Sequence, residues 1–239
     1  MVRVVVRVAV VAVVVAAMQA GTVTPTLSAR LDVLPVSTAA ADELLGRATV
    51  EVTALGCDLS LRQGTAVVVA PDQVLTNAHV VGRFRSVDVS ADGRPVIATA
   101  AVLASPAADL AVVDAGGLAL GPLSLAPDDP LPGEPVRVAG FPHDEHPTPG
   151  ATTTADGLVI EATSVVDYVD GGGMALRGVV MRLGAAVTPG MSGGPVLDRA
   201  GRLAGLVFGE QSPTGDALAI PASELRMVLA GGLTGSPGC

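Results

Sequence analysis

Residues 189–196 read PGMSGGPV, and this stretch decides how the rest of the chain is interpreted. Ser192 is flanked by glycines, which let the backbone turn sharply so that neighbouring N–H groups can point toward one place. By itself such a stretch is typical of a loop. It becomes informative only if residues elsewhere in the chain can act on the Ser192 hydroxyl.

Two residues that could do so precede Ser192. Residues 75–81 read LTNAHVV and contain His79, and residues 108–113 read ADLAVV and contain Asp109. Each has an ordinary interpretation alone, because a histidine among apolar residues is usual in a core and an aspartate before an apolar strand usually caps a turn. In the order histidine, aspartate, serine they predict an activated nucleophile, since a serine hydroxyl needs a neighbouring base and the base an orienting carboxylate.

The whole chain favours β structure. It has 239 residues, of which 49% are hydrophobic and only 2% aromatic, so a core must be built from Val, Leu and Ala. Short apolar runs separated by turn residues predict an all-β sandwich or barrel, with a connector at 128–135 and a short helix that continues to Leu229. The expected strands are 48–55, 65–69, 87–89, 96–103, 110–113, 136–141, 157–164, 175–183, 195–197, 203–208 and 217–220.

The three motifs together resemble a known family. TNAHVV around His79, DLAVV from Asp109 and GMSGGP around Ser192 are similar to the chymotrypsin-like (trypsin-like) serine peptidases, especially the bacterial high-temperature-requirement branch. The likeness is greater still to actinobacterial periplasmic peptidases related to the mycobacterial acid-resistance protease. Softer matches, GTAVVV at 64–69 and GRLAGLVFG at 201–209, extend it over roughly residues 50–229.

The resemblance implies a fold and a mechanism. The fold would be two six-stranded antiparallel β-barrels with the active site between them, followed by a short C-terminal helix. The activity would be that of a serine endopeptidase acting on proteins or peptides, without cofactor or metal. His79 would be the base, Asp109 its orienting group and Ser192 the nucleophile, and the N–H groups of Gly190 and Ser192 would form the oxyanion hole.

Two positions depart from the family's pattern. Most relatives have Asp or Asn directly before the serine, where this chain has Met191, so activation by an ion pair with a newly released N-terminus is not expected. At the base of the primary pocket, six residues before the serine, stands Ala186. No acid there selects Lys or Arg, and we expect a small or apolar substrate side chain, with Phe208 and Gly209 near the pocket wall.

The N-terminus predicts export. Arg3 and Arg7 precede an apolar run at 8–18, which is typical of a signal segment. Met18 fits the usual cleavage pattern poorly, and an apolar stretch extended to Val23 nearly spans a bilayer, so a single membrane anchor is the alternative to a cleaved signal, and a buried core helix is a third. We expect residues 1–23 to be signal or anchor, 24–46 a linker with one short helical turn near 39–45, and 47–239 the peptidase domain, outside the cytoplasm, either secreted or on the periplasmic face.

The two cysteines, Cys57 and Cys239, lie far apart in the sequence. In an exported protein paired cysteines usually form a disulfide, and we expect this one. The alternative is two unrelated thiols, one of them at a frayed terminus. The sequence therefore links the predicted disulfide to the predicted compartment.

Other function classes fit less well. The formal net charge is −9 and no basic cluster follows the N-terminus, so a nucleic-acid partner is not expected. His143 and His146 lie in FPHDEHP, which could suggest a metal site but is more typical of a solvated loop. An esterase of another fold would place its serine before its aspartate and histidine in the chain, which is not the order found here. A pseudoenzyme that uses the peptidase fold for binding is the remaining rival.

Overall fold

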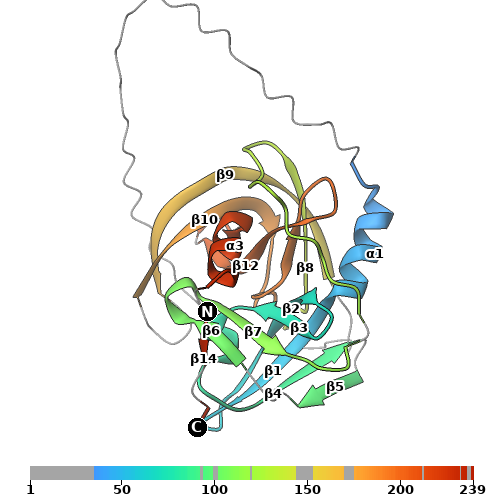
Figure 1. Ribbon diagram of the computed structural model, residues 1–239. Helices are drawn as coiled ribbons and strands as arrows, with labels where there is room; N and C mark the ends of the chain where they lie inside the picture. Colours follow the sequence, from blue (N-terminus) through green and yellow to red (C-terminus); the bar gives the residue numbers. More distant parts are fainter. Residues whose placement is uncertain are drawn as a thin grey trace, which may run out of the picture.

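The computed structural model describes residues 35–91, 94–98, 102–118, 120–143, 153–169, 175–211, 213–231, 233–235 and 238–239. The described part of the chain is mostly β and forms two sheets, each built largely from one half of the sequence (Figure 1). The predicted signal or anchor segment, residues 1–23, lies outside the described residues. Within them, no helix is long and apolar enough to cross a membrane.

The first sheet has eight strands and is open. In spatial order its strands are β14 (Thr234–Gly235), β6 (Val102–Ser105), β7 (Leu110–Asp114), β3 (Gln73–Thr76), β2 (Leu61–Ala70), β1 (Thr49–Gly56), β4 (Phe84–Ala91) and β5 (Arg94–Ala98). All neighbouring pairs are antiparallel. In β1 the buried residues Val50, Val52 and Ala54 alternate with half-buried ones, because successive side chains of a strand point to opposite faces.

The second sheet is a closed barrel of six strands. Around the barrel they are β10 (Ala175–Ala186), β13 (Asp216–Pro221), β12 (Leu203–Gln211), β11 (Pro195–Leu197), β8 (Pro135–Gly140) and β9 (Thr153–Val169). The barrel closes where β9 pairs with β10. Its interior holds Met181, Leu183, Met191 and Val207.

The expected pair of closed barrels is therefore found in part. The second half matches it, and so does the short C-terminal helix, α3 (Ala222–Leu229). The first half is a curled sheet that does not close in the described residues. Within these residues β5 pairs with β4, β6 pairs with β7 and with β14 from the C-terminal tail, and no pairing that would close the sheet is described.

A helix precedes the first strand, within the segment assigned to a linker from the sequence. This helix, α1 (Thr38–Ala48), begins at Ser37, whose hydroxyl accepts a hydrogen bond from the Ala40 N–H at 3.2 Å. Leu45 is completely buried in a core that also contains Leu197 and Leu203 of the barrel. Helix α1 thus packs as part of the folded domain (Figure 1).

An ion pair adds to the attachment of α1. The guanidinium of Arg137 on β8 contacts Asp42 on α1 at 2.6 Å, and also pairs with Asp156 on β9. Burial by itself would lower the pKa of Arg137, but its hydrogen bonds to Asp156 and Asp42 outweigh this and raise the pKa above its ordinary value. Arg137 therefore stays charged and links α1 to two barrel strands.

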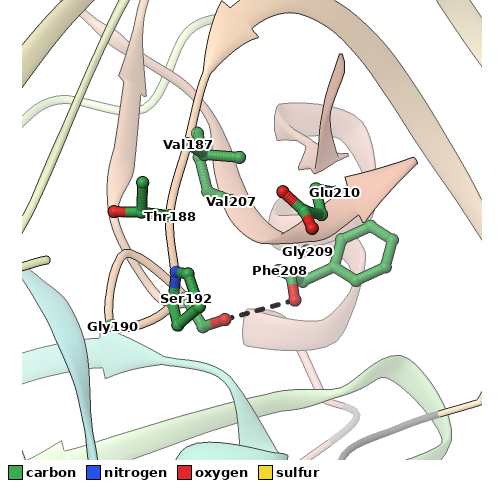
Figure 2. A pocket seen from close by; sticks show the side chains of 9 residues that line it. Val187, Thr188, Gly190, Ser192, Val207, Phe208, Gly209 and Glu210 are labelled. Atoms are coloured by element: carbon green, nitrogen blue, oxygen red, sulfur yellow. Dashed lines mark hydrogen bonds between the residues drawn. The ribbon is translucent and has the colours of Figure 1, made fainter. Parts of the chain in front are cut away.

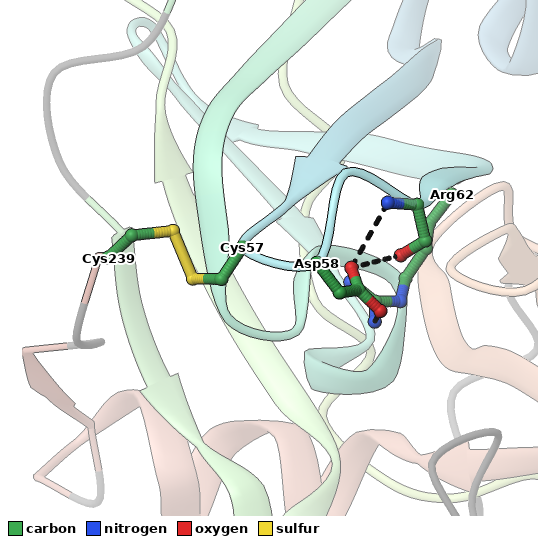
Figure 3. Close-up of a disulfide and its surroundings, with 5 residues drawn as sticks. Cys57, Asp58, Arg62 and Cys239 are labelled. Carbon is green, nitrogen blue, oxygen red and sulfur yellow. Dashed lines mark hydrogen bonds and ion pairs between the residues drawn. A yellow bond between two sulfur atoms is a disulfide. The ribbon is translucent and has the colours of Figure 1, made fainter.

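The Cys57–Cys239 disulfide joins the turn after β1 to the last residue of the chain, with the two Cα atoms 5.6 Å apart (Figure 3). The Cys239 N–H also donates to the Phe84 carbonyl at 3.1 Å. The disulfide and this hydrogen bond hold the end of the chain against the first sheet.

In the turn after β1, the hydroxyl and N–H of Ser60 donate to Asp58, and these hydrogen bonds lower the pKa of that exposed carboxyl.

Candidate active site

His79 lies on α2 (Ala78–Val81), a single helical turn directly after β3. Its ring Nδ1 is 2.8 Å from Asp109 Oδ2, and its backbone N–H donates to Asp109 Oδ1 at 2.9 Å. One carboxylate thus holds both the ring and the backbone of the histidine. Such a pairing selects the tautomer with the proton on Nδ1 and leaves Nε2 as a base.

Asp109 is held firmly as well. It is 1% exposed and follows a short 3₁₀ turn, η1 (Pro106–Ala108), at the point where the chain enters β7. Its φ of +52° lies in the left-handed region, which aspartate tolerates better than most residues. The side-chain amide of Asn77 donates to the Asp109 carbonyl at 3.0 Å, so three hydrogen bonds join Asn77 and His79 to Asp109. Asn77 was not singled out from the sequence.

Ser192 lies in the loop between β10 and β11, which belongs to the barrel, whereas His79 and Asp109 belong to the first sheet. The three predicted residues thus come from both halves of the molecule. The Ser192 hydroxyl donates a hydrogen bond to the Phe208 carbonyl on β12 at 3.3 Å (Figure 2). The one hydroxyl proton of Ser192 therefore points to Phe208, and no hydrogen bond joins Ser192 to His79 among the described residues.

Two glycines of this loop are required by its shape. Gly190 has φ +97° and Gly193 has φ +87°, where residues with a Cβ are strained. A Cβ on Gly193 would also lie 1.8 Å from the Thr65 carbonyl oxygen, and one on Gly190 would lie 2.3 Å from the Phe141 carbonyl oxygen. The loop can approach the neighbouring strands only because side chains are absent at these two positions.

The N–H groups of the loop divide into two sets. Those of Met191, Gly193 and Gly194 donate to backbone carbonyls at 2.7–3.1 Å. The N–H groups of Gly190 and Ser192, the residues expected to form an oxyanion hole, have no acceptor among the described residues. They are therefore available to an oxygen atom of a ligand that approaches Ser192.

A pocket of about 160 Å³ opens beside Ser192 (Figure 2). It is lined by Val187, Thr188, Pro189, Gly190, Ser192, Val207, Phe208, Gly209 and Glu210. Phe208 and Gly209 lie on its wall, whereas Ala186 is exposed and is not among the lining residues.

Glu210 is a pocket residue that the sequence analysis missed. It is the acidic residue among those lining the pocket, it is half-buried, and no ion pair holds its carboxylate within the described part of the chain. In Figure 2 the carboxylate lies opposite Thr188, beside Phe208 and Gly209. Glu210 follows directly after Phe208 and Gly209, which were expected near the pocket wall. This position points to Glu210 as a pocket residue only if β12 is known to form a wall of the pocket.

Met191, the departure before the serine, is 2% exposed and packs in the barrel core. A Cβ on Gly140 would lie 2.9 Å from Met191, so the two backbones are in close contact. The side chain thus occupies an apolar site.

Among the described residues no cluster of His, Cys, Asp or Glu could hold a metal ion, and His146 lies outside them.

Comparisons with known proteins agree with this arrangement. The family model described as a trypsin-like peptidase domain matches residues 64–206, more than half of the chain. The serine protease Rv3671c of Mycobacterium tuberculosis strain H37Rv is 32% identical over 147 residues, which cover 62% of this chain and 36% of that protein. The chain therefore spans little more than a third of the curated relative that it matches.

Solved structures extend the likeness beyond that segment. The crystal structure of the Rv3671c protease in its active form has a TM-score of 0.73 and 28% identity, and covers 94% of this chain and 99% of that one. Its inactive form has a TM-score of 0.67 and 26% identity, with 82% of this chain and 96% of that one covered. An HtrA-type protease, AlgW with a tripeptide, shares the fold at 24% identity and TM-score 0.66, over 82% of this chain and 64% of its own.

The family match covers the loop of His79, the turn of Asp109 and the loop of Ser192. The homologues are serine proteases, and one of them matches the fold over almost the whole length of its solved structure. The chain belongs to the family of trypsin-like peptidase domains.

Proposed function

We propose that this chain is a serine endopeptidase that hydrolyses peptide bonds in extracytoplasmic proteins through His79, Asp109 and Ser192. The observation that carries the proposal is the double contact of Asp109 with the Nδ1 atom and the backbone N–H of His79, at 2.8 and 2.9 Å. This contact supports a role for His79 as a base, because a proton held on Nδ1 leaves the Nε2 lone pair free. Family membership and the sharply turned glycine loop around Ser192 support Ser192 as the nucleophile that this base would activate.

In the proposed reaction, the Ser192 hydroxyl turns from the Phe208 carbonyl to Nε2 of His79, and the Oγ atom attacks the carbonyl carbon of the peptide bond as its proton passes to Nε2. The carbonyl oxygen becomes an anion, which the N–H groups of Gly190 and Ser192 bind, a contribution on the order of 3–4 kcal/mol each. The C–N bond then breaks and the leaving amine takes the proton from His79. Water repeats the sequence on the acyl-enzyme and releases the acid and free Ser192.

The pocket beside Ser192 supports a role in holding one substrate side chain. Its Val187, Val207 and Phe208 walls favour an apolar side chain or an apolar stem. Glu210 adds a negative charge near these walls, which disfavours an acidic substrate residue. The proposed substrates are therefore proteins or peptides cleaved after an apolar or long-stemmed residue.

The proposed compartment rests on the cysteines and the N-terminus. A disulfide such as Cys57–Cys239 persists in oxidising environments outside the cytoplasm. The basic start and the apolar run at 8–18 supply the route of export, as a cleaved signal or a single membrane attachment. N-terminal sequencing of protein recovered from the cell envelope and the medium distinguishes these two, and protein found only in the cytoplasm with free thiols would contradict export.

A cleavage assay with matched variants tests the activity. Wild-type protein is expected to cut a denatured protein substrate, and Ser192→Ala is expected to abolish cutting with an unchanged thermal transition. Asp109→Asn keeps the side-chain shape but removes the charge that orients His79, so kcat is expected to fall by about 10⁴-fold. Full cleavage by purified Ser192→Ala protein would remove Ser192 as the nucleophile and refute the proposal.

A further inference from the structure

Thr65 lies on β2 of the first sheet, is completely buried, and contacts the Ser192 loop of the barrel. Its hydroxyl donates to the Gly190 carbonyl oxygen at 2.8 Å and accepts from the Phe141 N–H at 2.9 Å. Its backbone N–H donates to the Ser192 carbonyl at 2.8 Å. One residue thus binds the carbonyls of both Gly190 and Ser192, 125 or more positions along the chain.

The hydroxyl bonds of Thr65 leave no ambiguity in direction. A threonine hydroxyl has one proton, and the Gly190 carbonyl can only accept, so the proton points to Gly190. The Phe141 N–H can only donate, so it fills a lone pair of the same oxygen. The two contacts therefore support each other and connect β2, the Ser192 loop and the end of β8 through one oxygen atom.

A second contact fixes the other side of Gly190. The His143 N–H donates to the Pro189 carbonyl at 2.7 Å, from the same segment that carries Phe141. In a trans peptide the C=O and the following N–H point in opposite directions, so the Gly190 N–H faces away from His143. With the Pro189 carbonyl and the Gly190 carbonyl both held, the peptide plane that carries the Gly190 N–H cannot rotate freely.

We propose that Thr65 is a positioning residue for the oxyanion hole. Its hydroxyl and the segment 141–143 hold the two peptides on either side of Gly190, and so keep the Gly190 N–H in the orientation that receives the developing oxyanion, before substrate binds. Thr65 acts through Gly190 and touches no reacting atom. This inference rests on the proposed function, because an oxyanion hole matters only if Ser192 attacks a carbonyl group.

The substitution Thr65→Val tests the proposal, since it keeps the branched shape and removes only the hydroxyl. Loss of one direct oxyanion donor lowers kcat by about 10²–10³-fold, so loss of the group that positions a donor is expected to lower kcat by about ten- to a hundredfold. KM for a peptide substrate is expected to change by less than threefold, because the pocket walls are untouched. Thr65→Ser keeps the hydroxyl and is expected to restore at least half of the wild-type kcat.

A peptide boronate supplies a readout that a merely structural role would not move. The boronate forms a tetrahedral anion on the serine and places an oxygen in the oxyanion hole, whereas the matching product peptide binds the pocket without that anion. Thr65→Val is expected to weaken boronate binding at least tenfold and product-peptide binding less than threefold. Equal weakening of both ligands would overturn the proposal.

Thr76→Val is the matched control. The Thr76 hydroxyl is also fully buried and donates to a backbone carbonyl, that of Thr65, at 2.6 Å, but among the described residues it makes no hydrogen bond to Gly190. The control is expected to lower thermal stability about as much as Thr65→Val while kcat stays within threefold of wild type. A Thr65→Val protein with wild-type kcat and boronate affinity refutes the inference, whereas a wild-type protein that cleaves nothing refutes the proposed function instead.

Discussion

At the scale of single residues, the site depends on backbone contacts as much as on the three side chains that carry the proposed chemistry. Asp109 holds His79 by its ring and by its backbone N–H. Gly193 lets the Ser192 loop approach β2, where any Cβ would overlap the Thr65 carbonyl. The histidine, the aspartate and the serine are identifiable from sequence because their motifs are local. The contacts that orient them join residues far apart in the chain, and no local pattern reports them.

Glu210 gives the first prediction, which concerns specificity. Its unpaired carboxylate on the pocket wall repels an acidic substrate side chain, since like charges near a surface interact by about 1–3 kcal/mol at separations near 6 Å. In peptides that differ only at the residue before the cut, Asp and Glu are expected to be poor substrates. Glu210→Gln is expected to raise kcat/KM for these peptides about tenfold and to leave a Leu peptide within twofold.

The matched control for Glu210 is Glu43→Gln, which removes one charge from the exposed face of α1. It should leave the ranking of peptides unchanged. An equal gain from both substitutions would show a general charge effect, and no gain from Glu210→Gln would show that the carboxylate does not face the substrate side chain.

At the scale of elements, the strands were predictable where apolar runs are bounded by turns, as in β1, β7 and β11. β3 was missed because it has only four residues and is followed almost directly by the apolar turn of His79. Four residues are too few for the alternation of buried and exposed side chains to be recognised as a strand. Of the single expected strand 96–103, the structure describes parts of β5 and β6, and residues 99–101 lie outside the described part of the chain. Helix α1 was underestimated as well, since Ala-rich sequence between polar residues carries a weak signal and its burial depends on the barrel.

Helix α1 gives a prediction about stability. Leu45 is 0% exposed and contacts the main core, so Leu45→Ala removes buried methyl groups and leaves a cavity. The free energy of unfolding is expected to fall by about 2–5 kcal/mol. Glu43→Ala on the exposed face of the same helix should change it by less than about 0.5 kcal/mol. Equal stability of the Leu45→Ala and wild-type proteins in urea unfolding would show that α1 does not belong to the cooperative unit.

At the scale of the whole molecule, the C-terminal tail adds a short strand to the first sheet. Thr234 and Gly235 form β14 on the free edge of β6, and the Cys57–Cys239 bond holds the end of the tail near Phe84. A Gly-rich tail has no periodic signal, so its strand pairing could not be predicted from sequence. The disulfide was expected because exported proteins usually pair their cysteines, and this expectation does not depend on where the two cysteines lie in the fold.

The disulfide gives a prediction about the whole fold. It closes a loop of 182 residues, for which the chain-entropy model gives at most about 5 kcal/mol of stabilisation. Reduction, or the pair Cys57→Ser and Cys239→Ser, is expected to lower the melting temperature, and adding a reductant to the double variant should have no further effect. Non-reducing mass spectrometry of the exported protein should find the linked peptides. Two free thiols in that protein would contradict the bond.

The central claim is that Ser192 is an activated nucleophile, and a fluorophosphonate probe tests it most directly, because the probe labels a serine only when a neighbouring base takes its proton. Tandem mass spectrometry of the labelled protein is expected to find the adduct on Ser192, with labelling lost in His79→Ala although the thermal transition is retained. Stable, folded wild-type protein that takes up no label, or an adduct on another serine, would contradict the account.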